Sequence, residues 1–458
     1  MDTKKLRQKI LDLAIRGKLV PQDPNDEPAS VLLERIKEEK ERLIKEGKIK
    51  KSKKTVSSDT YHYEQILPKG WCWTVLGDIF QHNNGKQKTS SNQEGELYKY
   101  ITTSNVYWNK FDFSEVKQMR FLESEFEKYI AKKGDLLVCE GGDIGRAAIW
   151  NYDYNICIQN HLHRLRAYIP VCTKYFLFSL MDSKAKGVIK GKGIGLMSLS
   201  ANDLHNIIIA LPPLSEQYRI VTEIERWFTL ISQIEQDKSA LQSVIKQAKS
   251  KILRLAIYGK LVPQDPNDEP ASELLKRINP NAEITCDNGH YTQLPDGWAA
   301  IKVGDVAIYI NGRAFKPEDW MCEGLPIIRI QNLNDKNAGY NRTTKTYESK
   351  YLIHNGDLLF AWAASLGTYI WNGGNAWLNQ HIFKVEPYQF IEKSYLYYIF
   401  KTMTTEFYAQ SHGSGMVHIT KKQFENIELL LPPLKEQKRI VQTLEQISTN
   451  LDQIVESL

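Results

Sequence analysis

The chain has 458 residues, 42% of them hydrophobic, and is long enough to bury two separate cores. No apolar run approaches the roughly 18 residues of a membrane span, and the first residues form no apolar segment suited to secretion. We therefore expect a cytoplasmic protein without a membrane partner. The net charge of +6 allows a polyanionic ligand but does not demonstrate one.

The first 60 residues are predicted to form a helix over 1–18, then a turn, a short helix over 31–46 and a basic linker, together spanning 19–60. Pro24 and Pro28 bound the turn, which also holds Asp23, Asp26 and Glu27. No lysine follows these carboxylates at the spacing of a nuclease, so we interpret the turn as a structural element or as a partner-binding surface. The lysine-rich residues 45–54 are either a phosphate- or partner-contacting linker or a solvated tether.

Residues 61–214 follow as a first globular block, in which Asn-Gly and Gly-Asp dipeptides bound short β-rich runs such as residues 135–139. The pattern is typical of a mixed α/β domain with many short strands.

The central segment, 215–259, has apolar residues at alternating steps of four and three, interrupted only by Lys238. Such a seam is typical of a coiled-coil helix, because it keeps one stripe facing a partner helix. The seam residues are Ile220, Ile224, Trp227, Ile231, Ile234, Leu241, Ile245, Ala248, Ile252 and Leu255.

The second half of the chain repeats this plan. Residues 9–36 return as 251–278 with four differences, and 211–221 return as 431–441. We expect a turn and linker over 260–289, a second globular block over 290–434 and a coiled-coil helix over 435–458. The two chain ends match the central seam in register, at Leu6, Ile10, Leu13, Ile440, Leu444, Ile447, Leu451, Ile454 and Leu458.

The chain ends therefore rebuild the central helix, and the connections require an antiparallel pair. About 44 residues at roughly 1.5 Å rise give a rod of about 65 Å, which predicts two α/β blocks separated by a long antiparallel coiled coil with an approximate two-fold axis. An ordinary helical hairpin inside one core is the alternative.

The two blocks share turn and strand residues but differ almost completely between them, as residues 107–133 and 334–355 show. Shared are Asn84-Gly85-Lys86 with Asn311-Gly312-Arg313, residues 101–106 with 328–333, and Gln159-Asn160-His161 with Asn379-Gln380-His381. One scaffold with different loops implies two versions of one binding task.

The duplicated element at residues 17–30 and 259–272, the Leu-Pro-Pro-Leu-x-Glu-Gln-x-Arg-Ile-Val motif before each long helix, and the two-block plan resemble the specificity subunit of type I DNA restriction-modification systems. The resemblance covers essentially the whole chain. It implies that each block is a target recognition domain for one half of a bipartite DNA site. It further implies a non-catalytic chain that docks two methyltransferase subunits and joins restriction subunits. S-adenosylmethionine, ATP and Mg²⁺ are then expected on those partners, with no cofactor on this chain.

Candidate DNA contacts are polar side chains near the shared elements of each block. In the first block they are Lys86, Lys88, Ser104, Asn105, Arg146, His161, His163, Arg164 and Lys192. In the second block they are Arg313, Lys316, Arg329, Gln331, Asn332, Thr368, Gln380, His381, His412 and Lys421. His161 and His381 could instead be satisfied inner residues, and Asn105 and Asn332 could cap backbone groups. We interpret Trp71, Trp73 and Trp298 as core residues.

No sequence motif for catalysis or metal binding is found. Phosphate-loop, zinc-protease and adenine-methyltransferase motifs are absent from the sequence, and residues 191–195 lack the strand and acidic residue of a nucleotide-binding turn. The six cysteines show no CxxC spacing and are expected to be buried free thiols. A tandem carbohydrate-binding protein and a structural scaffold remain alternatives to DNA binding.

Overall fold

The computed structural model describes residues 2–49, 66–89, 94–191, 198–278, 294–335, 337–363, 365–410 and 420–458. The chain divides into two compact units, Met1–Asp237 and Lys238–Leu458. The 44-residue helix α7 (Leu214–Ile257) contributes its first part to the first unit and its second part to the second. In the part of the chain that the structure describes, no helix is long and apolar enough to span a membrane.

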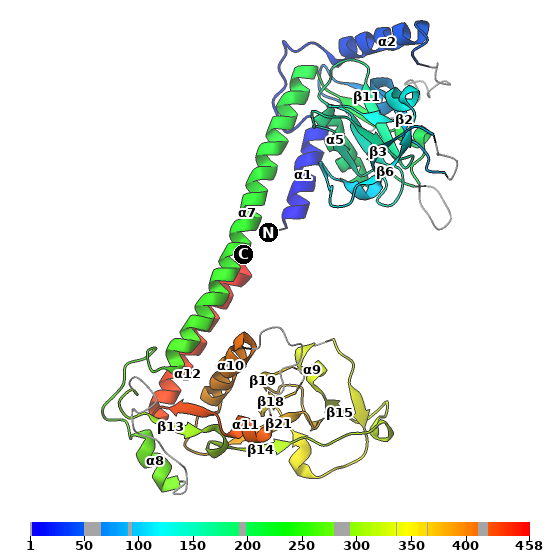
Figure 1. The fold of residues 1–458 in the computed structure, drawn as a ribbon. Helices are drawn as coiled ribbons and strands as arrows, with labels where there is room; N and C mark the ends of the chain where they lie inside the picture. The colour runs from blue at the N-terminus through cyan, green and yellow to red at the C-terminus, as the bar shows by residue number, and fades with distance from the viewer. Residues whose placement is uncertain are drawn as a thin grey trace. The chain divides into compact units, whose positions relative to one another are not determined.

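The first unit is a mixed α/β domain with helices α1 (Thr3–Ile15) and α2 (Ala29–Lys45) from the start of the chain (Figure 1). One four-stranded sheet has the order β6 (Lys117–Phe121), β3 (Glu96–Ile101), β10 (Ile156–Ile158), β7 (Ile130–Ala131). A second has the order β2 (Phe80–Asn84), β11 (Leu162–Ala167), β8 (Leu136–Cys139), β9 (Ala147–Ile149). Two-stranded pairs join β1 (Cys72–Val75) to β12 (Ile208–Leu211), and β4 (Val106–Tyr107) to β5 (Lys110–Phe111). The unit also contains α5 (Thr173–Ala185) and the shorter helices η2 (Thr103–Asn105), η3 (Glu123–Glu125), α3 (Leu76–Ile79), α4 (Phe126–Tyr129) and α6 (Ala201–His205).

The second unit repeats the two four-stranded sheets and the β1–β12 pair of the first. One four-stranded sheet has the order β16 (Asn341–Thr343), β15 (Leu325–Ile328), β20 (Ala376–Leu378), β17 (Leu352–Ile353). The other has the order β14 (Ala307–Asn311), β21 (Ile382–Pro387), β18 (Leu358–Ala361), β19 (Gly367–Ile370). Strand β13 (Ala299–Lys302) pairs with β22 (Glu428–Leu431). Its helices are α8 (Ala271–Ile278), η4 (Val303–Asp305), η5 (Pro317–Asp319), α9 (Ile330–Asn334), η6 (Ser349–Tyr351), α10 (Lys393–Gln410), α11 (Lys421–Glu425) and α12 (Leu434–Ser457). The prediction of two mixed α/β blocks on one plan is confirmed.

In each unit a chain end packs antiparallel on α7, as predicted. In the first unit, Arg7 of α1 donates to Ser232 Oγ over 2.9 Å, and farther along the chain Gln22 donates to Glu216 over 3.3 Å. In the second unit, Lys249 of α7 contacts Asp452 of α12 over 2.5 Å. Figure 1 shows α1 and α12 each lying along α7 within their own unit.

The predicted apolar seam is buried only in part. Ile220, Ile224 and Ile231 are at most 1% exposed, whereas Trp227 and Ile234 are 37% and 44% exposed. The packing within the unit therefore covers some seam positions and leaves others, such as Trp227 between Ile224 and Ile231, partly open.

The duplicated sequence motifs meet at one junction in each unit. In the first unit, Trp71 Nε1 donates to Glu216 over 2.9 Å, and Arg219 donates to Asp26 over 3.2 Å. Gly17 adopts a φ of +64°, and a Cβ there would lie 2.4 Å from Pro68 Cγ. These contacts explain why the three motifs recur together.

The second unit has the same junction. Trp298 Nε1 donates to Glu436 over 3.1 Å, and Arg439 donates to Asp268 over 2.7 Å. The acidic turns that hold Asp26 and Asp268 therefore have a structural role at the junctions. The described residues contain no cluster that could hold a metal ion. Trp71 and Trp298 are 8% and 4% exposed, which confirms their assignment to the core.

Of the cysteines, Cys139, Cys157 and Cys172 are buried and Cys72 is half-buried, whereas Cys322 is exposed, so the prediction of buried thiols is wrong for Cys322. Cys286 lies outside the described residues.

Candidate nucleic-acid interface

Three stretches that are distant in sequence meet beside the sheets of each unit. In the second unit, Arg313 N donates to Leu378 O over 2.8 Å and Asn379 N donates to Ile328 O over 3.1 Å. The turn 379–381 therefore lies between Arg313 and the residues that follow Ile328. Gly312 permits this approach, because a Cβ there would lie 2.2 Å from the carbonyl oxygen of Asn379.

The first unit builds the same arrangement. Lys86 N donates to Ile158 O over 2.9 Å, and Gln159 N donates to Ile101 O over 3.1 Å. A Cβ on Gly85 would lie 2.3 Å from the carbonyl of Gln159. The structure thus brings together the stretches that hold Lys86, Ser104 and His161 in one unit and those that hold Arg313, Arg329 and His381 in the other. That these side chains contact DNA stays a prediction.

Asn105 and Asn332 hold the backbone of this region. Asn105 Oδ1 accepts from Thr102 N over 2.9 Å while its Nδ2 donates to Glu115 O over 2.8 Å. Asn332 Oδ1 accepts from Arg329 N over 3.1 Å, and its Nδ2 donates to Gly339 O, also over 3.1 Å. The capping role that the sequence allowed for both residues is confirmed.

The second unit has a recess at this place. Its volume is about 410 Å³, and Arg329, Ile330, Gln331, Asn334, Asn379 and His381 line it. The Arg329 guanidinium lies 5.9 Å from the centre of the Trp320 ring, and its Nε is buried without a hydrogen-bond partner in the structure. Arg313 lies 4.4 Å from the centre of the Tyr347 ring. Among the described residues, neither guanidinium has an acidic partner.

The first unit places other groups at the equivalent positions. Lys86 Nζ lies 2.5 Å from Glu125 Oε2, so its charge is compensated. Arg146 Nη2 donates to Thr103 O over 2.8 Å, and its guanidinium lies 4.8 Å from the Tyr107 ring centre. His161 is exposed, 3.7 Å from Glu140, and His381 is also exposed, so neither is the inner residue that the alternative allowed.

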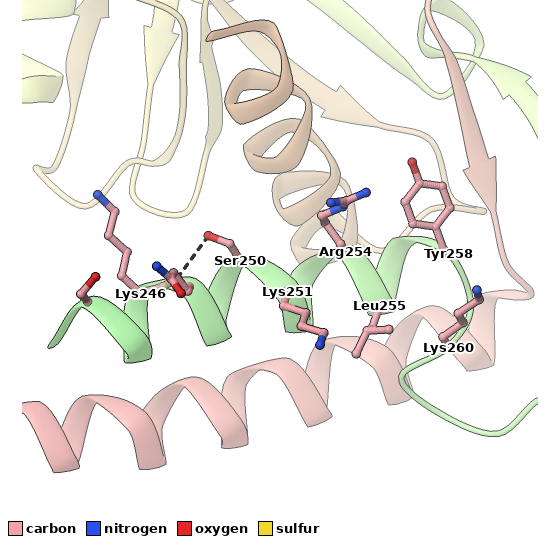
Figure 2. A pocket seen from close by; sticks show the side chains of 9 residues that line it. Lys246, Ser250, Lys251, Arg254, Leu255, Tyr258 and Lys260 are labelled. Atoms are coloured by element: carbon pink, nitrogen blue, oxygen red, sulfur yellow. Dashed lines mark hydrogen bonds between the residues drawn. The ribbon is translucent and has the colours of Figure 1, made fainter. Parts of the chain in front are cut away.

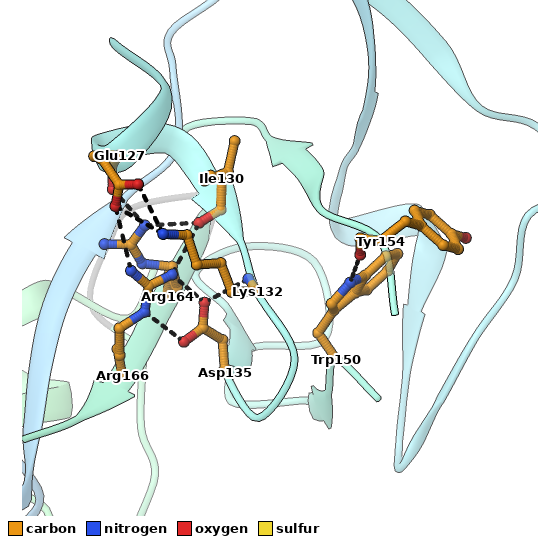
Figure 3. Close-up of polar contacts among 8 residues, drawn as sticks. All are labelled: Glu127, Ile130, Lys132, Asp135, Trp150, Tyr154, Arg164 and Arg166. Carbon is orange, nitrogen blue, oxygen red and sulfur yellow. Dashed lines mark hydrogen bonds and ion pairs between the residues drawn. The ribbon is translucent and has the colours of Figure 1, made fainter. Parts of the chain in front are cut away.

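Arg164 lies in the core of the first unit. It is 1% exposed, and its Nη1 donates to Ile130 O over 2.7 Å and to Glu127 O over 3.0 Å. Burial lowers the pKa of Arg164 to about 10. Figure 3 shows it beside Arg166, which contacts Asp135 over 2.6 Å. The structure gives Arg164 an internal role, and its assignment as a DNA contact stays a prediction.

His163, 0% exposed, belongs to a cluster with His82 and His205. Its Nε2 lies 2.8 Å from Leu199 O, which can only accept, so Nδ1 is left to accept from His82 Nε2 over 2.8 Å. Burial, followed by repulsion from His163, lowers the pKa of His82 to about 3. Burial also lowers the pKa values of His163 and His205. No sequence signal distinguished this cluster, because its members come from β2, β11 and α6.

The remaining candidates are scattered around these groups. Three of them are exposed, namely Lys88, Lys316 and Gln380. Two others donate to backbone carbonyls: Thr368 Oγ1 to Leu359 O over 3.4 Å, and Lys421 Nζ to Tyr309 O over 3.3 Å. Lys192 and His412, together with most of the glycine-rich turn at 191–195 and of the basic linker, lie outside the described residues.

In the second unit, α7 presents a basic pocket of about 810 Å³ lined by Lys246, Lys251, Arg254 and Lys260 (Figure 2). Among the described residues none of these four cations forms an ion pair. In the first unit Asp12 stands where Arg254 does, and it pairs with Lys186 over 2.7 Å. The two repeats therefore differ in charge on this helix face.

The chain is similar to known proteins over nearly its full length. It is 30% identical to the specificity subunit of the type I restriction enzyme EcoAI from Escherichia coli, over 97% of this chain and 88% of the relative. It is 28% identical to the EcoEI specificity subunit from the same species, over 98% of this chain and 90% of the relative.

Among solved structures, the HsdS subunit from Thermoanaerobacter tengcongensis shares the fold, with a TM-score of 0.56 and 20% identity over 85% of this chain and 92% of that one. A family model described as the type I restriction modification DNA specificity domain matches residues 68–242 and 295–457. The chain therefore belongs to the type I restriction modification DNA specificity family.

Proposed function

We propose that this chain directs a type I restriction-modification complex to an asymmetric bipartite DNA site, with one half recognised by each block. The observation that carries the proposal is the repeated scaffold with unlike side chains at matched positions. Lys86, Thr102 and Ser104 in the first block correspond to Arg313, Arg329 and Gln331 in the second. Base edges are distinguished by hydrogen-bonding side chains, so different side chains on one frame select different sequences.

The names of the relatives and the duplicated junctions support the partners. Two near-identical junctions offer the same surface twice, which suits two copies of one methyltransferase subunit, and restriction subunits would complete the assembly. The chain itself then contributes recognition and no catalysis, with S-adenosylmethionine, ATP and Mg²⁺ on its partners. We place this assembly in the cytoplasm, and the α7 helix pairs would set the distance between the half-sites.

The experiment combines the chain with its methyltransferase partner. Binding to duplex DNA carrying the methylated motif should weaken steeply with salt, because lysine and arginine contacts release counterions from phosphates. A carbohydrate-binding protein or a scaffold would show no such dependence.

Exchanging residues 61–214 for the block of a relative should then change one half of the methylated motif and leave the other half intact. A change in both halves would contradict the assignment of one half-site to each block.

A further inference from the structure

Arg329 occupies a position where the two blocks carry different side chains on the same backbone frame. Its backbone N is held by the Asn332 cap, just as Thr102 N is held by Asn105. The Cα positions are therefore fixed alike, and only the side chain differs. The first block carries a threonine at this position and the second block an arginine.

The Arg329 side chain is left available by its surroundings. Its Nε is buried without a hydrogen-bond partner, and no described carboxylate pairs with it. It lines the 410 Å³ recess together with Gln331 and His381, both exposed. A partly buried arginine whose donors are unused inside a recess is costly to keep unless a ligand accepts from it.

The other described candidate cations do not meet these conditions together. Arg313 Nε is likewise buried without a hydrogen-bond partner, but Arg313 lies against Tyr347 and is not part of the recess lining. Lys86 is compensated by Glu125, and the Thr102 hydroxyl is 2.7 Å from Ser104 Oγ. Arg329 is thus the one described candidate with a free fork of donors inside a recess.

Resting on the proposed function, we propose that Arg329 specifies a guanine in the half-site recognised by the second block. Its two-pronged donor set matches the O6 and N7 acceptors that only guanine presents together in the major groove. Gln331 and His381 line the same recess and offer polar groups to the flanking bases. The first block has no such fork at Thr102 and selects its half-site through other groups.

The test uses the whole chain with its methyltransferase partner and compares Arg329→Lys and Arg329→Ala with the unaltered protein. Methylation rates are measured on duplexes in which each base pair of one half-site is varied in turn. The half-site of the second block is the one that survives exchange of the first block. Arg342→Lys is the matched control, because Arg342 is an exposed arginine of the same block that donates to Gly324 O over 3.0 Å.

We expect Arg329→Lys to lose about 10- to 100-fold in preference for guanine at one position, since lysine keeps the charge but not the fork. Arg329→Ala should show the same relaxed position, and Arg342→Lys should keep the motif. Thermal unfolding of each variant separates loss of recognition from loss of folding, and Arg329→Lys keeps the test decisive if Arg329→Ala unfolds.

Two results would overturn the inference while the proposed function stands. One is a bipartite motif whose second half contains no guanine on either strand. The other is an Arg329→Lys variant with unchanged selectivity, which would mean a phosphate contact. If the unaltered complex methylates no defined bipartite motif, the proposed function itself fails and the inference with it.

Discussion

The histidine cluster predicts that the first unit loses stability in mild acid while the second does not. His82, His163 and His205 are held neutral in the folded chain, and burial is the largest cause of each lowered pKa. Protonating one of them would place a charge among its neighbours and near Arg164 and Lys40, and the described carboxylates that oppose it are Asp78 and Glu140.

The magnitude follows from the difference between folded and unfolded pKa values. The folded pKa of His82 is about 3, whereas an unfolded histidine titrates near 6.5. The neutral His82 contributes fully to the stability of the folded unit above about pH 6.5. This contribution is lost as the pH falls, because the unfolded chain then binds a proton at His82 and the folded chain does not. Between pH 7 and pH 5 the free energy of unfolding should fall by about 2 kcal/mol for His82 alone.

Hydrogen exchange measured by mass spectrometry at pH 7 and pH 5, corrected for intrinsic rates, reports both units in one sample. Protection in β2 and β11 should drop far more than in β14 and β21, where Tyr309 and Phe383 stand in place of His82 and His163. The double variant His82→Tyr with His163→Phe should reduce the acid sensitivity, and His354→Gln, at an exposed histidine, should not. Equal losses in both units, or no change in the double variant, would refute the reasoning.

Three further predictions follow from the junction, the helix and the first block. Trp298→Phe removes the donor to the buried Glu436 carboxylate and should lower the free energy of unfolding of the second unit by about 1–3 kcal/mol in denaturant titration; no change would show that this hydrogen bond is dispensable. Four residues inserted after Asp237 add about 6 Å of helix, so the mapped motif should gain about two base pairs of spacer, and an unchanged spacer would contradict the role of α7. Glu125→Gln frees Lys86 and should steepen the salt dependence of DNA binding by about one unit of slope; an unchanged slope would place Lys86 away from phosphate.

Much of the fold could be predicted from the sequence, because an internal repeat implies that the same structure is built twice. The seam in α7 and its matches at both chain ends predicted the helix pairs, and the Asn-Gly and Gly-Asp dipeptides predicted a domain of many short strands. Gly85 and Gly312 recur because side chains there would collide with backbone carbonyls.

The pairing of strands in the sheets and the roles of polar residues inside the core could not be predicted from the sequence. The parallel pairing of β10 with β3 joins strands more than fifty residues apart, and no local pattern specifies such a register. Arg164 and Arg166 lie two positions apart on strand β11. Only the three-dimensional structure shows that Arg164 is buried while Arg166 pairs with Asp135. The junction between Trp71 and Glu216 likewise depends on contacts between distant motifs.

The most direct measurement is sequencing of methylated bases in a host that carries the complete restriction-modification system with this chain as its specificity subunit. Two unlike short sequences separated by a spacer of constant length are predicted, each altered separately by changes in one block. A single continuous motif, or a palindrome with identical halves, would contradict the assignment of one half-site to each block.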